Sequence, residues 1–456
     1  MEWPENASKF NLDEIYDKLK GCVYGAAIGD AIGLATEFMS KEKARKLYGI
    51  GPITFGTEKG YEFYIDRQRE RWNDGDWTDD TANDGIFNSR DFAMGLKKWV
   101  DQGFPELDNK PPCGIGLTVG SVLNHPQFLK KPHKSAWDIW IQYDRNMAAN
   151  GALMRTSILG VPFFWDEKQV IKQTLQATKV THADPRCGLS SIILTSLISR
   201  LIKGNVQDIP TDLTEEDKKE ILNCNKMSKM IEKVKHLNHS SSKSPSINEL
   251  WLKRRKRSSQ LNKPREPAII PDPLPPGIEL FGVDPVMLAL IKSLVDRYKF
   301  IILNIPDTSQ EKPSSKKNKK IDSSRLQTDL SEEALKKYCF PESLASLELD
   351  EPSSIGYVYK CLGSALYCVT RNLNKVENES VAFKKIITEL ALEAGDADTN
   401  ATVAGALLGT RIGYNKLPKE WVEGLKYKTF LDEKINNLWK IMSNSDWVDV
   451  KEPIID

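Results

Sequence analysis

Two short acidic segments, far apart in the sequence, carry the side chains best suited to chemistry. The first spans residues 78–81 and reads Thr-Asp-Asp-Thr, and the second spans residues 396–400 and reads Asp-Ala-Asp-Thr-Asn. Each segment places two carboxylates and a hydroxyl within a few positions. Carboxylates that a fold brings together repel one another unless a cation neutralises them. The two segments therefore predict a site for divalent cations.

The predicted ligands of this site are all oxygen atoms. Its four carboxylates and two hydroxyls belong to Asp79, Asp80, Asp396, Asp398, Thr78 and Thr399. Oxygen ligands without His or Cys suit hard cations such as Mg²⁺ or Mn²⁺ and do not suit Zn²⁺. Four negative charges balance two Mg²⁺ ions, which predicts a binuclear site with the metals about 3.5–4 Å apart. Such a site can orient a substrate diol and polarise a water molecule.

A simpler interpretation is that each acidic segment caps a helix. Asp, Thr and Asn side chains accept hydrogen bonds from the first backbone N–H groups, and acidic side chains suit the positive end of a helix. Two features favour the metal site. A cap uses one oxygen, whereas each segment offers at least three. The residues that follow are small or apolar, such as Ala82 and Ile86 or Ala401 and Val403, so both helix starts should face the protein interior.

The elements that must position these segments are mainly helices. Apolar residues at three- and four-residue intervals predict helices over residues 20–36, 80–100, 149–160, 184–203, 356–371, 379–393 and 399–413. The first of these stretches is rich in Gly and Ala, which indicates a buried helix in close contact with a neighbour. A break at Gly29–Asp30 is one possibility. Short strand signals at residues 53–55 and 63–65 allow a small hairpin.

The middle of the chain differs in composition from both ends. Between residues 204 and 345 it is polar and uneven, with a low-complexity, lysine-rich stretch at 311–324 and helices expected at 214–236 and 284–303. Because the acidic segments lie on either side, we interpret 10–203 and 346–450 as one helical domain. We interpret 204–345 as an insertion with at least one helix. A basic run at 253–257 fits a solvated loop better than a nuclear localisation signal or nucleic-acid patch.

Composition argues against several classes of protein. The chain has 456 residues, of which 40% are hydrophobic and 28% charged, as in soluble globular proteins. A formal net charge of +1 argues against nucleic acid or an acidic membrane surface as a partner. No apolar run reaches the ~18–20 residues of a membrane span, and the N-terminus does not read as a signal peptide. The scattered cysteines indicate reduced thiols. We therefore expect an intracellular monomer, cytoplasmic or nuclear.

Five motifs occur in a characteristic order along the chain. They are Gly25–Gly33 with Glu37 and Phe38, Trp77–Thr81, Asn150–Arg155, Thr181–His182, and Gly395–Ala401. No single motif is decisive. The ordered set resembles the ADP-ribosylglycohydrolase family, the group that includes dinitrogenase reductase-activating glycohydrolase. The resemblance covers residues 20–205 and 350–415.

The resemblance implies a compact all-α fold with two Mg²⁺ ions in a central cleft. It implies hydrolysis of the glycosidic bond that joins ADP-ribose to a protein side chain or to another ADP-ribose. The partner would be an ADP-ribosylated protein or a small molecule that contains ADP-ribose. The family's metal ligands would be Thr78, Asp79, Asp80, Asp396, Asp398 and Thr399. The ADP-ribose pocket would be lined by Asn150, Gly151 and His182.

The same resemblance suggests which carboxylates act in catalysis. Glu37 would lie beside the metals as a ligand or gate. Asp79 or Asp396 would deprotonate the water that attacks the anomeric carbon, as in other glycoside hydrolysis. The sequence does not choose between these two. Arg155 fits an internal ion pair as well as it fits a ligand contact.

Two alternative functions stay open. A catalytically inactive protein of the same fold would bind ADP-ribose or serve a structural role without cleaving it. The loop at residues 144–149 favours this alternative, because relatives carry Gly and Ser there and glycine lets backbone N–H groups approach phosphate. Arg145 could replace those phosphate contacts. A two-metal phosphohydrolase of another helical family would need His- or Glu-rich ligand motifs, and none occurs at convincing spacing.

Overall fold

The computed structural model describes most of the chain. It covers residues 10–55, 63–66, 69–72, 75–78, 88–104, 115–208, 212–225, 277–303, 330–373, 376 and 378–443. The predictions for Asp79, Asp80 and the basic run at 253–257 lie outside these residues. Every regular element within them is a helix, which confirms the all-α class. The only pairings of β type are isolated bridges within this described part.

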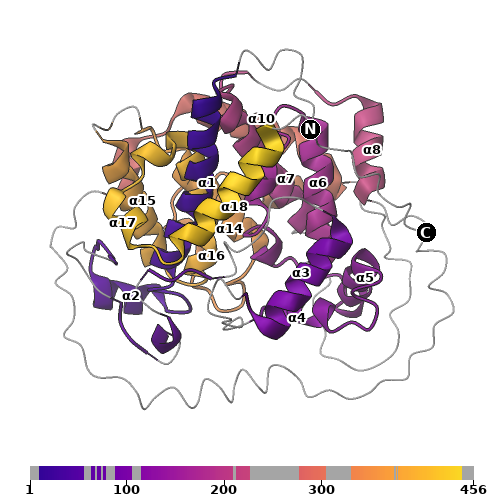
Figure 1. Ribbon diagram of the computed structural model, residues 1–456, viewed down its shortest axis with the longest axis horizontal. Coiled ribbons are helices and arrows are strands. Elements are labelled where there is room, and N and C mark those ends of the chain that lie inside the picture. The colour runs from indigo at the N-terminus through magenta and orange to yellow at the C-terminus, as the bar shows by residue number, and fades with distance from the viewer. Residues whose placement is uncertain are drawn as a thin grey trace.

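The α-helices fall into two groups along the chain (Figure 1). Those before the middle are α1 (Leu12–Gly33), α2 (Lys41–Tyr48), α3 (Ser89–Gln102), α4 (Leu117–Leu123), α5 (Pro132–Gln142), α6 (Glu167–Thr181) and α7 (Pro185–Lys203). Those that follow are α8 (Glu215–Asn225), α10 (Pro285–Tyr298), α11 (Phe300–Leu303), α13 (Glu332–Cys339), α14 (Val358–Val369), α15 (Glu379–Leu392), α16 (Ala397–Ile412), α17 (Lys419–Gly424) and α18 (Lys428–Ser443). Predicted helices at 184–203, 356–371, 379–393 and 399–413 are thereby confirmed as α7, α14, α15 and α16.

Helices α1 and α16 form an antiparallel pair in the middle of the core, with their backbones in contact. Glycines recur at every fourth position of α1 and face small residues of α16. A Cβ added at Gly25 would collide with the carbonyl oxygen of Gly405, and one at Gly29 with that of Ala401. This confirms the predicted close contact. Helix α1 is continuous from Leu12 to Gly33, so the possible break at Gly29–Asp30 does not occur.

The other long helices pack around this pair. Helices α14 and α15 lie against α16, and α7 contacts α6, α10, α14 and α16. Helix α10 contributes Leu290, Ile291 and Leu294 to the main hydrophobic core, and α13 packs on α14. The described helices from the polar middle of the chain therefore share the core of the flanking segments. The boundaries of an insertion at 204–345 stay a prediction.

A second, smaller core joins α3, α4 and α5 to α6. It contains Phe128, Trp140 and Val180, all buried. This lobe holds the loop that leads from α5 to Asn150. Within the described residues, no helix is long and apolar enough to cross a membrane. The cysteines whose surroundings are described are buried free thiols, as the sequence predicts.

Two local predictions are wrong. Residues 149–160 form short 3₁₀ turns, η4 (Asn150–Ala152) and η5 (Ser157–Gly160), instead of one α-helix. The reason is that Ala149 pairs with Tyr357 in an isolated bridge, which takes the start of the segment out of helical geometry. No hairpin joins residues 53–55 and 63–65, since 63–65 are irregular. The N–H of Tyr64 donates instead to the hydroxyl of Tyr48 at 2.8 Å.

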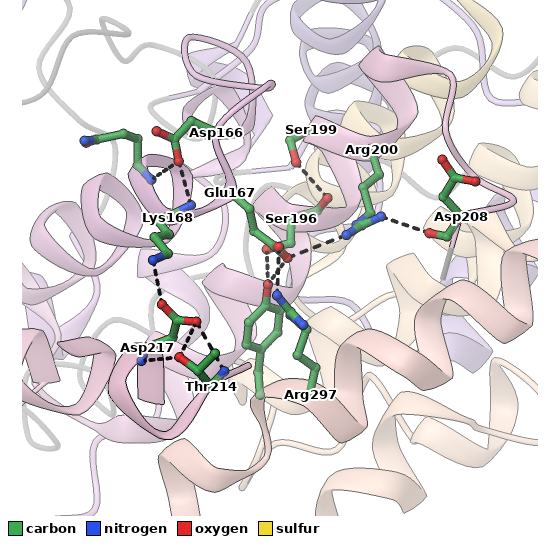
Figure 2. Close-up of polar contacts among 12 residues, drawn as sticks. Asp166, Glu167, Lys168, Ser196, Ser199, Arg200, Asp208, Thr214, Asp217 and Arg297 are labelled. Carbon is green, nitrogen blue, oxygen red and sulfur yellow. Dashed lines mark hydrogen bonds and ion pairs between the residues drawn. The ribbon is translucent and has the colours of Figure 1, made fainter. Parts of the chain in front are cut away.

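A polar cluster joins the beginning of α6 to the ends of α7 and α10 (Figure 2). The Glu167 carboxylate lies 2.9 Å from Nη2 of Arg297 and 3.8 Å from Nη2 of Arg200. It also accepts a 2.5 Å hydrogen bond from the hydroxyl of Tyr298, whose pKa is raised by burial and by Glu167. One carboxylate therefore serves donors from two other helices.

Replacing Glu167 by Gln should destabilise the fold. The neutral amide loses the attraction to both arginines and turns an N–H group toward donors. We expect the free energy of unfolding to fall by about 1–3 kcal/mol, measured by urea denaturation. As a control, Asp101→Asn removes an exposed partner of Lys97 in α3 and should change that energy by less than about 0.5 kcal/mol. Equal effects of the two substitutions would show that the cluster contributes nothing beyond a surface ion pair.

Candidate functional site

The turn between α15 and α16 presents the second acidic segment. Ala394 and Gly395 both have left-handed backbone conformations, with φ of 60° and 73°. A Cβ on Gly395 would collide with the carbonyl oxygen of Leu349, so glycine is required there. The turn places Asp396 at the N-cap of α16. Its side chain makes no capping hydrogen bond, so the carboxylate is left for other partners.

Asp398 and Thr399 lie in the first turn of α16, and both are buried. The Cα of Asp398 lies so close to Gly33 that a Cβ on Gly33 would overlap it. The last turn of α1 is therefore in direct contact with the first turn of α16. The hydroxyl of Thr399 reaches the sulfur of Met154 at 3.8 Å.

Glu37 is held next to this segment by backbone hydrogen bonds. The N–H of Phe38 donates to the carbonyl of Gly395 at 2.6 Å, and the N–H of Gly395 donates to the carbonyl of Met39 at 3.2 Å. Arg69 donates to the carbonyl oxygen of Glu37 from the other side. Glu37 itself is buried. The backbone that follows Glu37 is thus hydrogen-bonded to Gly395, the residue before Asp396.

Thr78, the first residue of the first acidic segment, lies against the same stretch of α1. The backbone N–H and the hydroxyl of Thr78 both approach Oδ2 of Asp30, at 2.9 and 3.2 Å. Asp30 is fully buried and precedes Gly33 by one helical turn. Since Gly33 touches Asp398, Thr78 and Asp398 lie around the same end of α1. Asp79 and Asp80 follow Thr78 directly but fall outside the described residues.

Asp30 is a functional candidate that sequence reasoning did not single out. Because Asp30 accepts a hydrogen bond from the Thr78 hydroxyl, it fixes the direction in which that hydroxyl points. A carboxylate behind a ligand commonly orients it in this manner. The available signal was a charged residue in the second half of α1, residues 21–33, where no other residue is charged.

Asn150 connects a third part of the chain to Asp396. Its Nδ2 donates to Oδ2 of Asp396 at 2.7 Å, and its backbone N–H donates to the carbonyl of Gly356 at 2.9 Å. Burial raises the pKa of Asp396 above its ordinary value, and the hydrogen bond from Asn150 opposes that rise. A Cβ on Gly356 would lie 3.6 Å from both side chains, in ordinary contact. Asn150 therefore fixes the orientation of this carboxylate.

Gly151 and His182 face each other beside Asn150. A Cβ on Gly151 would lie 3.4 Å from Cε1 and 3.5 Å from Nε2 of His182. The imidazole is buried, and its Nδ1 lies 2.8 Å from the hydroxyl of Thr181. Burial and the nearby Arg155 lower the pKa of His182 to about 3. The ring is therefore neutral near pH 7.

A buried ion pair supports the loop that precedes Asn150. Arg186 donates to both oxygens of Asp184, from Nε at 2.9 Å and from Nη2 at 2.8 Å, and Trp140 donates to the same carboxylate. Arg186 also donates to the side chain of Asn146 at 3.3 Å. Sequence reasoning missed this pair, because nothing local distinguishes it from an exposed one.

In the loop at residues 144–149, two residues other than glycine adopt the left-handed backbone conformation that glycine favours. Asp144 and Arg145 have φ of 53° and 60°. Their N–H groups donate within the turn, to the carbonyls of Ile141 and Trp140. These two N–H groups are therefore not available to a phosphate. The guanidinium of Arg145 lies over the Trp140 ring, 6.0 Å from its centroid.

The donor set fits hard cations. The predicted ligands that the structure describes offer only carboxylate and hydroxyl oxygens, and they gather at one end of the α1–α16 pair. Among the described residues, no three acidic, His or Cys side chains are arranged as a metal site. Half of the predicted carboxylates, Asp79 and Asp80, lie outside that set.

Comparisons with known proteins give one consistent family. The family model described as ADP-ribosylglycohydrolase matches residues 11–268 and 287–447. An ADP-ribosylarginine hydrolase Tri1 from Serratia proteamaculans is 26% identical over 208 residues, which are 43% of this chain and 50% of that protein. An ADP-ribosylarginine hydrolase Tri1 from Pseudomonas putida is 23% identical over 163 residues, which are 31% of this chain and 35% of that protein.

One solved structure completes the comparison. It is described as an ADP-ribosylglycohydrolase-related protein complex and aligns with a TM-score of 0.41 at 15% identity, covering 94% of this chain and 99% of that chain. The chain spans about half or less of the length of the two curated relatives.

Proposed function

Because the chain belongs to the ADP-ribosylglycohydrolase family, we propose that it hydrolyses the glycosidic bond between ADP-ribose and the group attached to it. One observation carries the proposal. Segments around Glu37, Thr78, Asn150 and Asp396 come from four distant parts of the chain and meet at one end of α1 and α16. A purely structural role would not require this convergence of polar groups.

The first substrate to test is ADP-ribose attached to arginine. Two of the curated relatives carry the name ADP-ribosylarginine hydrolase, which favours an N-glycosidic bond. Serine-linked ADP-ribose and poly-ADP-ribose are the other candidates, because an O-glycosidic bond at the same ribose carbon would present the same hydroxyls to the site.

We further propose that the site holds two Mg²⁺ ions, with Mn²⁺ as a substitute. The residues that would hold them are Thr78, Asp79, Asp80, Asp396, Asp398 and Thr399. Bound there, the cations would neutralise the carboxylates and act as Lewis acids toward the ribose hydroxyls. Asp30 supports this assignment, since it accepts a hydrogen bond from the hydroxyl of Thr78 and so orients one of the proposed ligands.

Asp396 is suited to accept a proton from water. Asn150 engages Oδ2 and leaves Oδ1 without that donor, and the side chain is only partly buried. The water oxygen would then attack the anomeric carbon of the ribose while the bond to the leaving group breaks. Asp79 remains the other candidate for this role.

Thermal melting with Mg²⁺ and ADP-ribose tests the binding part of the proposal. A ligand that binds only the folded protein should stabilise it by about 2.7 kcal/mol at a hundred times its Kd. We expect the melting temperature to rise with Mg²⁺ alone, to rise further when ADP-ribose is added, and to return to baseline with a chelator. No rise with either compound would exclude both the enzyme and an inactive ADP-ribose-binding protein.

A turnover assay then distinguishes the enzyme from an inactive ADP-ribose-binding protein. The full chain should release ADP-ribose from an ADP-ribosylated arginine peptide in the presence of Mg²⁺, measured by chromatography. Binding of ADP-ribose without release from arginine, serine or poly-ADP-ribose substrates would instead favour a binding protein. The departure of the loop before Asn150 from glycine is the observation that keeps this second function under test.

A further inference from the structure

The imidazole of His182 has one hydrogen-bonding nitrogen that is used and one that is not. Its Nδ1 lies 2.8 Å from the hydroxyl oxygen of Thr181. Its Nε2 is buried and has no hydrogen-bond partner in the described structure. The same Thr181 hydroxyl lies 3.3 Å from Nη1 of Arg155. Three side chains, Arg155, Thr181 and His182, thus form a short buried chain.

The chemistry of the groups gives this chain a direction. A guanidinium has N–H groups and no acceptor, so Arg155 must donate to the oxygen of Thr181. The Thr181 hydroxyl has a single proton, and its remaining neighbour is Nδ1 of His182. If Thr181 donates that proton to Nδ1, both contacts are satisfied. If Nδ1 carried a proton instead, the buried hydroxyl proton would be left without an acceptor, which is unfavourable.

The charge of Arg155 favours the same arrangement. It lies on the Nδ1 side of the ring, through the shared hydroxyl, so a lone pair on Nδ1 faces the cation more favourably than an N–H group would. Arg155 also disfavours a positive charge on the ring, which burial already disfavours. The neutral tautomer that remains carries its proton on Nε2.

Nε2 lies beside Gly151, one of the residues predicted to line the ligand pocket. Nε2 would lie 3.5 Å from a Cβ at Gly151, and Gly151 follows Asn150, which binds Asp396. The absence of a side chain at Gly151 leaves room beside the imidazole edge. A buried N–H group without an acceptor is unfavourable, and an oxygen atom of a ligand would satisfy it.

We propose that Arg155 and Thr181 are positioning residues that fix His182 as a neutral Nε2–H donor to an oxygen acceptor of the bound ADP-ribosyl group. This inference rests on the proposed function for the identity of the ligand, but the tautomer is a property of the protein alone. The donor keeps its proton and stays neutral throughout the range in which the enzyme would work.

The tautomer can be read directly from the full-length protein by NMR. Long-range ¹H–¹⁵N correlation of the ring nitrogens of ¹⁵N-labelled protein at neutral pH distinguishes a protonated from an unprotonated nitrogen. The signals of His182 are identified by their loss in His182→Gln. We expect Nε2 to be protonated and Nδ1 unprotonated. A proton on Nδ1, or an imidazolium, would overturn the proposal whether or not ADP-ribose binds.

The binding arm compares two substitutions of one residue. Thr181→Val keeps the shape but removes the hydroxyl, whereas Thr181→Ser keeps the hydroxyl. Isothermal titration with ADP-ribose should show weakening on the order of tenfold for Thr181→Val and wild-type affinity within about threefold for Thr181→Ser. The Nε2-protonated signal should be lost or mixed only in Thr181→Val. Equal affinity and an unchanged tautomer in Thr181→Val would refute the positioning role. Wild-type protein that binds no ADP-ribose, with the expected tautomer, would refute the proposed function instead.

Discussion

Replacing Asp396 by Asn should lower glycohydrolase turnover by on the order of 10²–10⁴-fold, the usual contribution of a positioned general base. The same substitution should leave stability without Mg²⁺ unchanged or raise it. The Asp396 carboxylate, at the N-cap of α16, makes no capping hydrogen bond. It is partly buried and lies two residues before Asp398. Removing its charge therefore relieves the desolvation that raises the pKa of this carboxylate. Release of ADP-ribose and urea denaturation measure the two effects.

Asp284→Asn is the matched control, because Asp284 is also the N-cap of a helix. Its carboxylate accepts from the N–H groups of Val286 and Met287 and pairs with Arg411, far from the proposed site in sequence and contacts. Here turnover per folded molecule should be unchanged and the free energy of unfolding should fall by about 1–3 kcal/mol. If Asp396→Asn followed this pattern instead, the second acidic segment would be a helix cap and not a catalytic element.

The convergence of the two acidic segments could be expected from residue types alone. Side chains that repel one another need a common partner. The structure brings Thr78 and Asp398 to the last turns of α1, whereas Asp79 and Asp80 lie outside the described residues. The sequence did not predict which residue of α1 holds Thr78 in place. The contact depends on Asp30, which lies nearly fifty residues before Thr78 and has no local pattern that links the two.

The close packing of α1 on a neighbouring helix could be predicted from the sequence, but its partner α16 was not identified there. Glycines at every fourth position of α1 indicated a neighbour at short distance, and the small residues of α16 were its natural partner. Residues 149–160 show the opposite case. Their apolar spacing predicted a helix, but the bridge between Ala149 and Tyr357 decides the backbone there. A pairing between residues so far apart in sequence overrides local periodicity.

The ligand side of the site was the least predictable. His182 was expected near the pocket, but its tautomer depends on Thr181 and Arg155, and Arg155 fitted an internal ion pair equally well in the sequence. The Asp184–Arg186 pair that holds the loop before Asn150 has no sequence signature at all. Location in the cell, oligomeric state and the linkage that is cut stay predictions, because they rest on surfaces and partners rather than on the core.

Gly29→Ala should strongly destabilise the protein. A Cβ at Gly29 would approach the carbonyl oxygen of Ala401 more closely than one at Gly25 or Gly33 would approach α16. The obstacle is backbone in the middle of a buried helix and cannot rotate away. The helices would have to separate, which disturbs packing along their length. We expect a loss of at least about 3 kcal/mol in the free energy of unfolding.

Gly95→Ala provides the matched control for this substitution. Gly95 lies inside α3, and a Cβ there would meet nothing within 4 Å. Alanine should therefore act only through helix propensity and raise the free energy of unfolding by about 0.5–1 kcal/mol. Urea denaturation of both variants, followed by circular dichroism, compares them. Opposite signs would establish that α1 and α16 are held in backbone contact. Because Thr78 and Asp398 each approach the last turns of α1, Gly29→Ala should also weaken Mg²⁺ binding in the fraction that stays folded, whereas Gly95→Ala should not.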